Sequence, residues 1–230
     1  MNRKTRSYES GELVVHYDVK RCIHAEECVH GLPSVFDPVR RPWIDPEAAD
    51  AASVVEVVER CPTGALRYEW KSGGRPEKAA VPSVIRVSEN GPLYIRGDVS
   101  IESGVDDESL RENRVALCRC GRSKDKPFCD NSHMSAEFVD GGRIAGEPAV
   151  RDEQAPHALS LKPIPNGPVL VRGRYVLEEA DGTRIEGEGG ALCRCGHSAS
   201  KPFCDGAHKQ VGFSTEPGSD EADPQVGGGR

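Results

Sequence analysis

The sequence predicts an α+β protein in which a helix-containing segment precedes two small β-rich repeats, each with one short helix. This prediction depends on an internal duplication after residue 80 and on a helix-start signal that occurs before it. We expect an N-terminal domain over residues 1–72 and the repeats over residues 81–150 and 156–215. Residues 216–230 are acidic and Gly-rich, and we expect a disordered tail there.

The duplication consists of sequence blocks that recur at nearly constant spacing. Residues 90–97 recur at 166–173, residues 116–121 at 191–196, and residues 126–130 at 201–205. The first block is offset by 76 residues and the other two by 75, so one loop differs in length by one residue. The two copies are therefore one structural unit that occurs twice.

Alternating apolar residues predict strands at 83–87 and 93–96, with Asn90-Gly91-Pro92 as the turn and residues 169–171 as the matching strand of the second copy. The N-terminal segment has a strand pattern at 12–17. There Asp45 and Pro46 fit the N-cap and first position of a helix that runs to Arg60. Residues 71–78 are the expected linker.

Composition excludes several classes of protein. The net charge of −7 argues against nucleic-acid binding, and no apolar run is long enough to cross a membrane. We expect a soluble cytoplasmic protein, in which the nine cysteines are thiols rather than disulfides.

Each repeat carries Cys-x-Cys, eight further residues, and Cys-x-x-x-His. If Pro127 begins a helix, Cys129 and His133 share one helix face, while Cys118 and Cys120 project together from an extended stretch. Three thiolates and one imidazole would then converge. The second copy supplies Cys193, Cys195, Cys204 and His208, with Pro202 in the position of Pro127.

The spacing leaves two types of metal site open. Structural zinc accepts three cysteines and one histidine, but its ligand pairs are usually two to four residues apart. One Cys–Cys pair and one Cys–His pair instead favour a two-iron cluster, with one pair on each iron.

The motif Cys-Arg-Cys-Gly-x-Ser-x-x-Lys-Pro-Phe-Cys-Asp-x-x-His resembles the CDGSH-type, or mitoNEET-like, iron–sulfur domain in both copies. The resemblance implies a [2Fe–2S] cluster in each repeat, with the three cysteines and the histidine as ligands. It also implies that the two units pair through shared strands, here within one monomeric chain. Asn131 replaces the glycine of the signature, and we expect it to tolerate the left-handed backbone.

Cys22, Cys28 and Cys61-Pro62 form a third set. A ferredoxin run would have another cysteine where Ala25 stands. Residues 13–70 nevertheless resemble the divergent single-cluster ferredoxins. Three thiolates suit a [3Fe–4S] cluster, or a [4Fe–4S] cluster with another fourth ligand. His24 is a conceivable ligand, although we interpret it as a surface residue. The alternative is three buried structural cysteines.

These features predict an electron-transfer protein whose partner is a redox protein. A redox- or pH-responsive sensor, or a donor of clusters to an apo acceptor, is the alternative, and a structural zinc protein is a third. No catalytic arrangement of side chains stands out, so we do not expect an enzyme.

Overall fold

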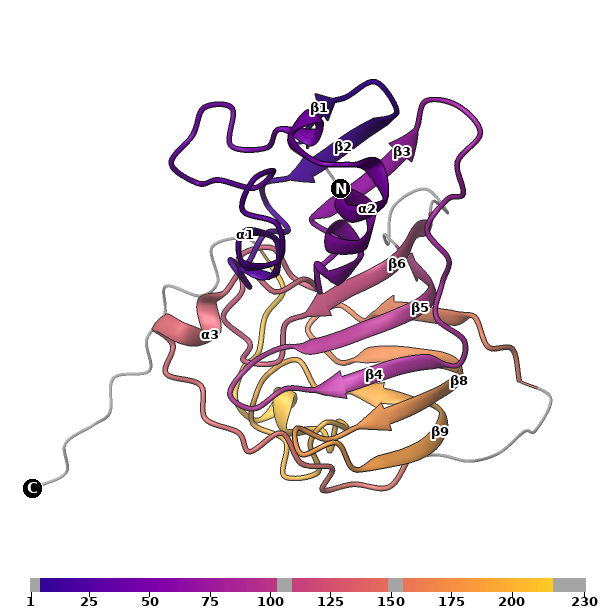
Figure 1. Ribbon diagram of the computed structural model, residues 1–230. Coiled ribbons are helices and arrows are strands. Elements are labelled where there is room, and N and C mark those ends of the chain that lie inside the picture. The colour runs from indigo at the N-terminus through magenta and orange to yellow at the C-terminus, as the bar shows by residue number, and fades with distance from the viewer. Residues whose placement is uncertain (1–4, 103–108, 149–154, 217–230) are drawn as a thin grey trace, which may run out of the picture.

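The computed structural model of the chain describes residues 5–102, 109–148 and 155–216 (Figure 1). It has an N-terminal α+β domain and a larger β-rich body that contains both repeats. The α+β prediction is therefore confirmed. The expected disordered tail lies outside the described residues except for Glu216. Within the described ranges, every helix is too short or too polar to cross a bilayer.

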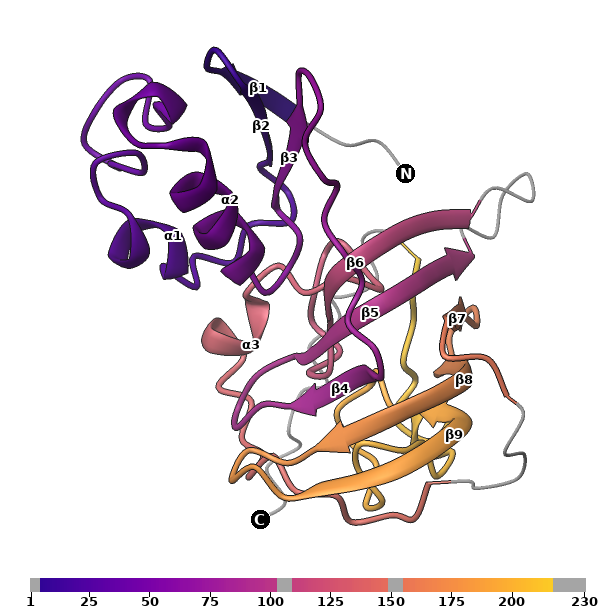
Figure 2. The same cartoon turned by 45° about the vertical axis from the view of Figure 1, so that its right-hand side comes forward.

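The N-terminal domain is a three-stranded antiparallel sheet with helices against one face (Figure 2). Its elements are β1 (Thr5–Glu9), β2 (Leu13–Asp18), α1 (Glu27–Gly31), the 3₁₀ turn η1 (Pro46–Ala48), α2 (Ala51–Arg60) and β3 (Leu66–Trp70). The strand order is β1-β2-β3. Val54 and Val58 of α2 pack in one buried cluster with Leu13 and Val15 of β2, which joins the helix to the sheet.

The helix predicted over residues 45–60 is divided into two pieces. Asp45 caps the short turn η1, with Pro46 at its first position, as the sequence indicates. The chain is then extended at Ala49 and Asp50, and α2 begins only at Ala51. Asp50 is a second N-cap, because its Oδ1 accepts a hydrogen bond of 2.9 Å from the backbone N–H of Ser53. The second capping residue, which the sequence analysis missed, explains the division.

In the described part of the chain, the body contains six strands, three from each repeat. The first repeat contributes β4 (Ser83–Val87), β5 (Leu93–Glu102) and β6 (Ser109–Leu117), and the second β7 (Leu159–Pro163), β8 (Val169–Glu178) and β9 (Arg184–Leu192). The short helices of the repeats are α3 (Ser132–Ser135) and the 3₁₀ turn η2 (Ala207–Lys209). The strand predicted at 83–87 is confirmed, whereas β5 runs six residues beyond its predicted end.

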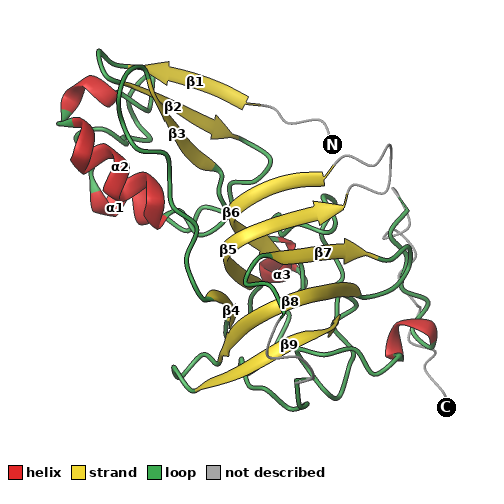
Figure 3. Ribbon diagram, turned by 90° about the vertical axis from the view of Figure 1, so that its right-hand side faces the viewer, coloured by secondary structure: helices red, strands yellow, loops and turns green. Residues whose placement is uncertain are grey.

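Each repeat lends its first strand to the other repeat. β4 pairs antiparallel with β5 of its own repeat and parallel with β8, while β7 pairs antiparallel with β8 and parallel with β5. β4, β5, β7 and β8 therefore form a closed ring of pairings, and β6 and β9 extend it from β5 and β8 (Figure 3).

β5 and β8 can serve both repeats because each changes register near its middle. The shifts lie between Arg96 and Val99 and between Val171 and Arg174. Gly97 and Gly173 lie within these shifts. A Cβ on Gly173 would stand 2.3 Å from the carbonyl oxygen of Ala158, so only glycine permits this close approach.

The strand exchange produces one hydrophobic core shared by both repeats. Its fully buried members include Ile85 and Ile101 of the first repeat and Leu161 and Leu177 of the second. Because neither repeat encloses this core alone, the two repeats should unfold as one unit.

We predict that Leu161→Ala destabilises both repeats together by about 2–5 kcal/mol, as expected for a large truncation in a packed core. Hydrogen-exchange mass spectrometry in increasing urea should show peptides of β5 and β8 opening at the same, lowered concentration. Lys162→Ala is the matched control, because this exposed side chain makes only a surface ion pair with Glu102. Separate opening of the two repeats would contradict a shared core.

Candidate metal-cluster sites

Each repeat brings its four predicted ligands together as two pairs. In the first-repeat site, the Sγ atoms of Cys118 and Cys120 are 3.7 Å apart, and Cys129 Sγ lies 3.4 Å from Nδ1 of His133. The second-repeat site repeats this geometry, at 3.7 Å between Cys193 and Cys195 and 3.3 Å between Cys204 and His208. The eight predicted donors thus form four close pairs, two in each repeat.

The route by which Cys129 meets His133 differs from the prediction. Pro127 does not begin a helix; Phe128 forms an isolated β-bridge with Leu117, and α3 starts only at Ser132. Cys129 is held extended because its N–H donates to the carbonyl of Ala116 at 2.9 Å. The shared helix face was therefore wrong, and the same correction applies at Pro202, where Phe203 bridges Leu192.

A left-handed residue makes the turn between each cysteine and histidine. Asn131 has φ +75° and Gly206 has φ +92°, so the expectation that asparagine tolerates this backbone is confirmed. The turn aims a backbone N–H at each sulfur: Asn131 N lies 3.4 Å from Cys129 Sγ, and Gly206 N lies 3.4 Å from Cys204 Sγ. These donors favour the thiolate form that a metal requires.

Asp130 fixes the ligand loop from within. Its Oδ1 accepts from the N–H of Ser132 at 3.0 Å and its Oδ2 from the N–H of Lys124 at 2.8 Å. Ser123 completes the brace, because its hydroxyl donates to the carbonyl of Phe128 at 2.6 Å. Asp205 makes the matching contacts with the backbone N–H groups of Ala207 and Ala199.

The arginine within each Cys-Arg-Cys sequence is a buried structural residue. Arg119 is 1% exposed and donates to the carbonyl oxygens of Gly91, at 2.9 Å, and Ser88. Arg194 makes the same contacts with Gly167, at 2.8 Å, and Ile164. Each arginine ties the cysteine loop to the Asn-Gly-Pro turn, so the recurring blocks of the duplication hold each other.

The thiols of each Cys-x-Cys pair have unequal pKa values. A hydrogen bond from Cys120 lowers the pKa of Cys118 to about 7, and one from Cys195 lowers that of Cys193 to about 6. The same bonds raise the pKa values of the two donor thiols. Burial raises the pKa of Cys129 to about 12. Each site thus contains one readily formed thiolate, and binding a metal must release the remaining protons.

The two repeat sites lie back to back. Gly121 and Gly196 have φ values of +82° and +84° and follow the second cysteine of each pair. A Cβ on Gly121 would stand 2.8 Å from the carbonyl oxygen of Cys195, and one on Gly196 would stand 3.1 Å from that of Cys120. The two ligand loops therefore support each other across the boundary between the repeats.

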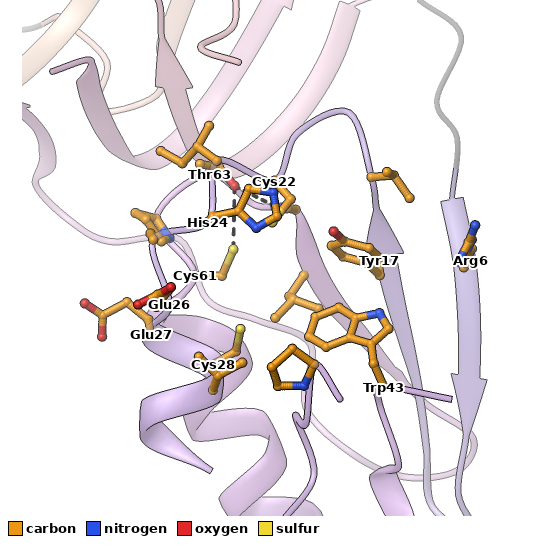
Figure 4. Close-up of a pocket in the computed structure, with 18 of the residues that line it drawn as sticks. Arg6, Tyr17, Cys22, His24, Glu26, Glu27, Cys28, Trp43, Cys61 and Thr63 are labelled. Carbon is orange, nitrogen blue, oxygen red and sulfur yellow. Dashed lines mark hydrogen bonds between the residues drawn. The ribbon is translucent and has the colours of Figure 1, made fainter. Parts of the chain in front are cut away.

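The third predicted set lines a cavity of about 520 Å³ in the N-terminal domain (Figure 4). This N-terminal site draws Cys22 from the loop after β2, Cys28 from α1 and Cys61 from the C-cap of α2. Cys61 Sγ lies 3.6 Å from the hydroxyl oxygen of Thr63. Burial and, to a smaller extent, the nearby Cys61 raise the pKa of Cys28 to about 11. The structure thus brings all three thiols to one cavity.

Other residues also line this cavity. His24 is exposed and lies on the loop between Cys22 and Cys28, where its backbone has a positive φ of 55°. Tyr17 and Trp43 form part of the cavity wall, and the sequence analysis missed both of them. The position of Tyr17 at the end of a predicted strand was the one signal that could have placed it near this site. Burial and a hydrogen bond with Cys22 raise the pKa of Tyr17.

The donors do not form single-ion sites. Among residues 5–102, 109–148 and 155–216, no three or more histidine, cysteine, aspartate or glutamate side chains are grouped to hold one metal ion.

Comparison with protein families adds independent evidence. The family described as "Divergent 4Fe-4S mono-cluster" matches residues 8–71, and "Iron-binding zinc finger CDGSH type" matches residues 90–134 and 166–209. The chain belongs to the tandem CDGSH-type iron–sulfur proteins. In this CDGSH-type protein, a divergent 4Fe-4S mono-cluster domain precedes the two CDGSH domains.

The chain also has curated relatives. It is 39% identical over 66 residues to the uncharacterized protein YjdI of Escherichia coli strain K12, and equally to YjdI of Escherichia coli O157:H7. Each match covers 29% of this chain and 87% of the relative. No solved structure matches the chain.

We predict that Gly121→Ala lowers the metal content of both repeat sites. The new methyl group would clash with the backbone of Cys195, and alanine is strained at the positive φ of this position. Iron and sulfide content and visible absorbance should both fall. Gly182→Ala is the matched control, since Gly182 has φ +89° but nothing within 4 Å of the new Cβ. Equal metal loss in the two variants would show that the contact between the loops is unimportant.

Proposed function

We propose that this protein transfers electrons through three iron–sulfur centres: one His-ligated [2Fe–2S] cluster in each repeat and one [3Fe–4S] or [4Fe–4S] cluster in a ferredoxin-like N-terminal domain. The observation that carries the proposal is the arrangement of all nine cysteines into three sets, two of which add a histidine. Bound clusters of these types supply one-electron chemistry, and the chain's own residues hold and tune them.

The pairwise geometry of the repeat sites supports a two-iron cluster in each. Two sulfurs bound to one tetrahedral metal by bonds of ~2.3 Å lie roughly 3.8 Å apart, close to the 3.7 Å of each Cys-x-Cys pair. The Cys–His pair forms a second, separate unit of similar size. One pair per iron is the arrangement that this donor set fits.

The N-terminal site supports a centre with three thiolate ligands. The cavity beside Cys22, Cys28 and Cys61 is larger than the sulfur atoms need, and soft thiolates suit iron–sulfur clusters. His24 lies on this cavity and is the residue to test as a fourth ligand.

We further propose that the protein is a cytoplasmic monomer that exchanges electrons with another redox protein and turns over no organic substrate. The pairing of the repeats within one chain supports the monomer, because it provides internally the strand exchange that two chains would otherwise share.

Anaerobic purification followed by iron, zinc and sulfide analysis and by EPR tests the proposal. We expect iron and sulfide for two [2Fe–2S] clusters and one three- or four-iron cluster, all of which accept electrons. Colourless protein that contains zinc alone would contradict it.

We predict that His133→Cys lowers the reduction potential of the first-repeat centre, because a thiolate donates more negative charge to iron than an imidazole does. Redox titration followed by EPR measures the shift. Asp125→Asn, at a neighbouring residue that binds no metal in this proposal, is the control. An unchanged potential in His133→Cys would show that His133 is not a ligand.

A second candidate function is donation of a cluster to an apo acceptor. The observation that favours it is a difference between the repeats: Cys129 and His133 are buried, whereas Cys204 and His208 are partly exposed. An acceptor protein would reach the second-repeat site more easily. Acid would also displace the imidazole from iron more readily at this more exposed site.

We predict that, as the pH falls, the second-repeat centre is lost before the first. Burial lowers the pKa of His133, so this imidazole stays neutral to lower pH than an exposed one. His208→Cys should remove the faster phase of absorbance loss, and His133→Cys should affect only the slower phase. A faster phase that survives in His208→Cys would contradict this assignment.

A further inference from the structure

The N-terminal domain packs against the Cys129 side of the first-repeat site, whereas the matching Cys204 side of the second-repeat site is partly exposed. Ala116 and Cys129 are 2% and 3% exposed, whereas the matching Ala191 and Cys204 are partly exposed. Figure 2 shows the N-terminal domain beside β6 and α3 of the first repeat. Two sites of one design therefore have different surroundings.

An apolar contact joins the N-terminal site to the first-repeat site. Ile23, which follows Cys22 in the chain, is 6% exposed and packs in one cluster with Ala116 and Cys129. Tyr94 of β5 packs against the same cluster. A single residue, bonded to one predicted ligand and packed with another, thus connects the two donor sets.

Arg114 of β6 connects the first repeat to the N-terminal domain. Its side chain is 2% exposed and donates to the carbonyl oxygens of Cys61 at 2.7 Å and Leu66 at 3.0 Å. It also forms a bidentate ion pair with Glu77 of the predicted linker, at 2.7 and 2.8 Å. One buried cation therefore holds the Cys61 loop, β3 and the linker together.

Arg21 makes a second polar contact beside the first. Its guanidinium lies 3.6 Å from the centre of the Phe128 ring, in the residue before Cys129. It also lies 3.8 Å from Glu112 of β6 and donates to the carbonyl of Thr63 at 3.3 Å. Both charged side chains of the Arg21–Glu112 pair are almost fully buried.

The second repeat lacks the residues that make these contacts. The positions 75 residues after Glu112 and Arg114 are Gly187 and Gly189. The two copies therefore differ at the very positions that hold the N-terminal domain, and only the first repeat carries a docking surface for it.

We propose that the packing of Ile23 against Cys129 is an electron-transfer junction between the N-terminal site and the first-repeat site. The first-repeat site is then the middle one of three sites that pass electrons in order. Cys22, Cys28 and Cys61 would hold the centre that gives up one electron, and the four donors of the first repeat would hold the centre that accepts it, with no atom transferred. The donors of the second repeat, across the Gly121–Cys195 contact, would hold the next acceptor. This inference rests on the electron-transfer function proposed above.

Histidine ligation raises the potential of a [2Fe–2S] cluster above that of a [2Fe–2S] cluster held by thiolates alone, which suits the repeat sites to the accepting end of the series. The partly exposed second-repeat site is the place where an oxidised partner protein collects them.

Pulsed EPR of dithionite-reduced protein tests the junction by the magnetic interaction between centres, which needs no partner or turnover. Cys129→Ser and Cys204→Ser are a matched pair, each impairing one repeat site. We expect the interaction of the N-terminal centre with its nearest neighbour to be lost in Cys129→Ser and retained in Cys204→Ser. Equal effects of the two variants, or no interaction in iron-loaded wild-type protein, would overturn the junction.

Arg114→Met tests separately whether the contacts of Arg114 hold the N-terminal domain against the first repeat. We expect it to keep its iron but to lose the interaction, and to unfold its N-terminal domain at lower temperature, which the fluorescence of Trp43 and Trp70 reports. Arg111→Met, on the exposed side of β6, is the control. If the magnetic interaction is retained in Arg114→Met, Arg114 does not hold the two domains together as proposed. Centres that accept no electrons at all would instead overturn the proposed function, so the two failures are distinguishable.

Discussion

The exchange of strands between the repeats is the constraint on which the rest of the structure depends. Because β4 pairs with β8 and β7 with β5, the two copies enclose one core, and their ligand loops meet back to back. The metal sites lie at the ends of β6 and β9, so the sheet sets their separation. A chain with few aromatic residues and many glycines and prolines gains a substantial core in this way.

Within this frame, buried arginines perform most of the positioning. Arg119 and Arg194 join each cysteine loop to the turn of its own repeat, and Arg114 joins the first repeat to the N-terminal domain. Each meets backbone carbonyl oxygens with several of its five donors, which offsets the cost of burying the charge. The ligand loops are thus held by the protein itself, and bound clusters would add to a frame that already exists.

The sequence predicted which residues lie close together better than it predicted the path of the chain between them. Cysteine and histidine spacing indicated residues that the structure places in close pairs or around one cavity. The helix expected at Pro127 was wrong, since the pairing of Phe128 with Leu117 outweighs local helix signals. The buried Arg114 and the cavity-lining Trp43 were also missed, because their roles arise from contacts between segments far apart in the sequence.

Mössbauer spectroscopy of protein loaded with enriched iron tests the central claim most directly, because it reads the ligands of each iron. The account predicts two unequal iron environments in each repeat: one for an iron bound by two cysteines, the other for an iron bound by cysteine and histidine. The spectrum should change at one of them in His208→Cys. Equivalent irons throughout, or the absence of bound iron, would contradict the account.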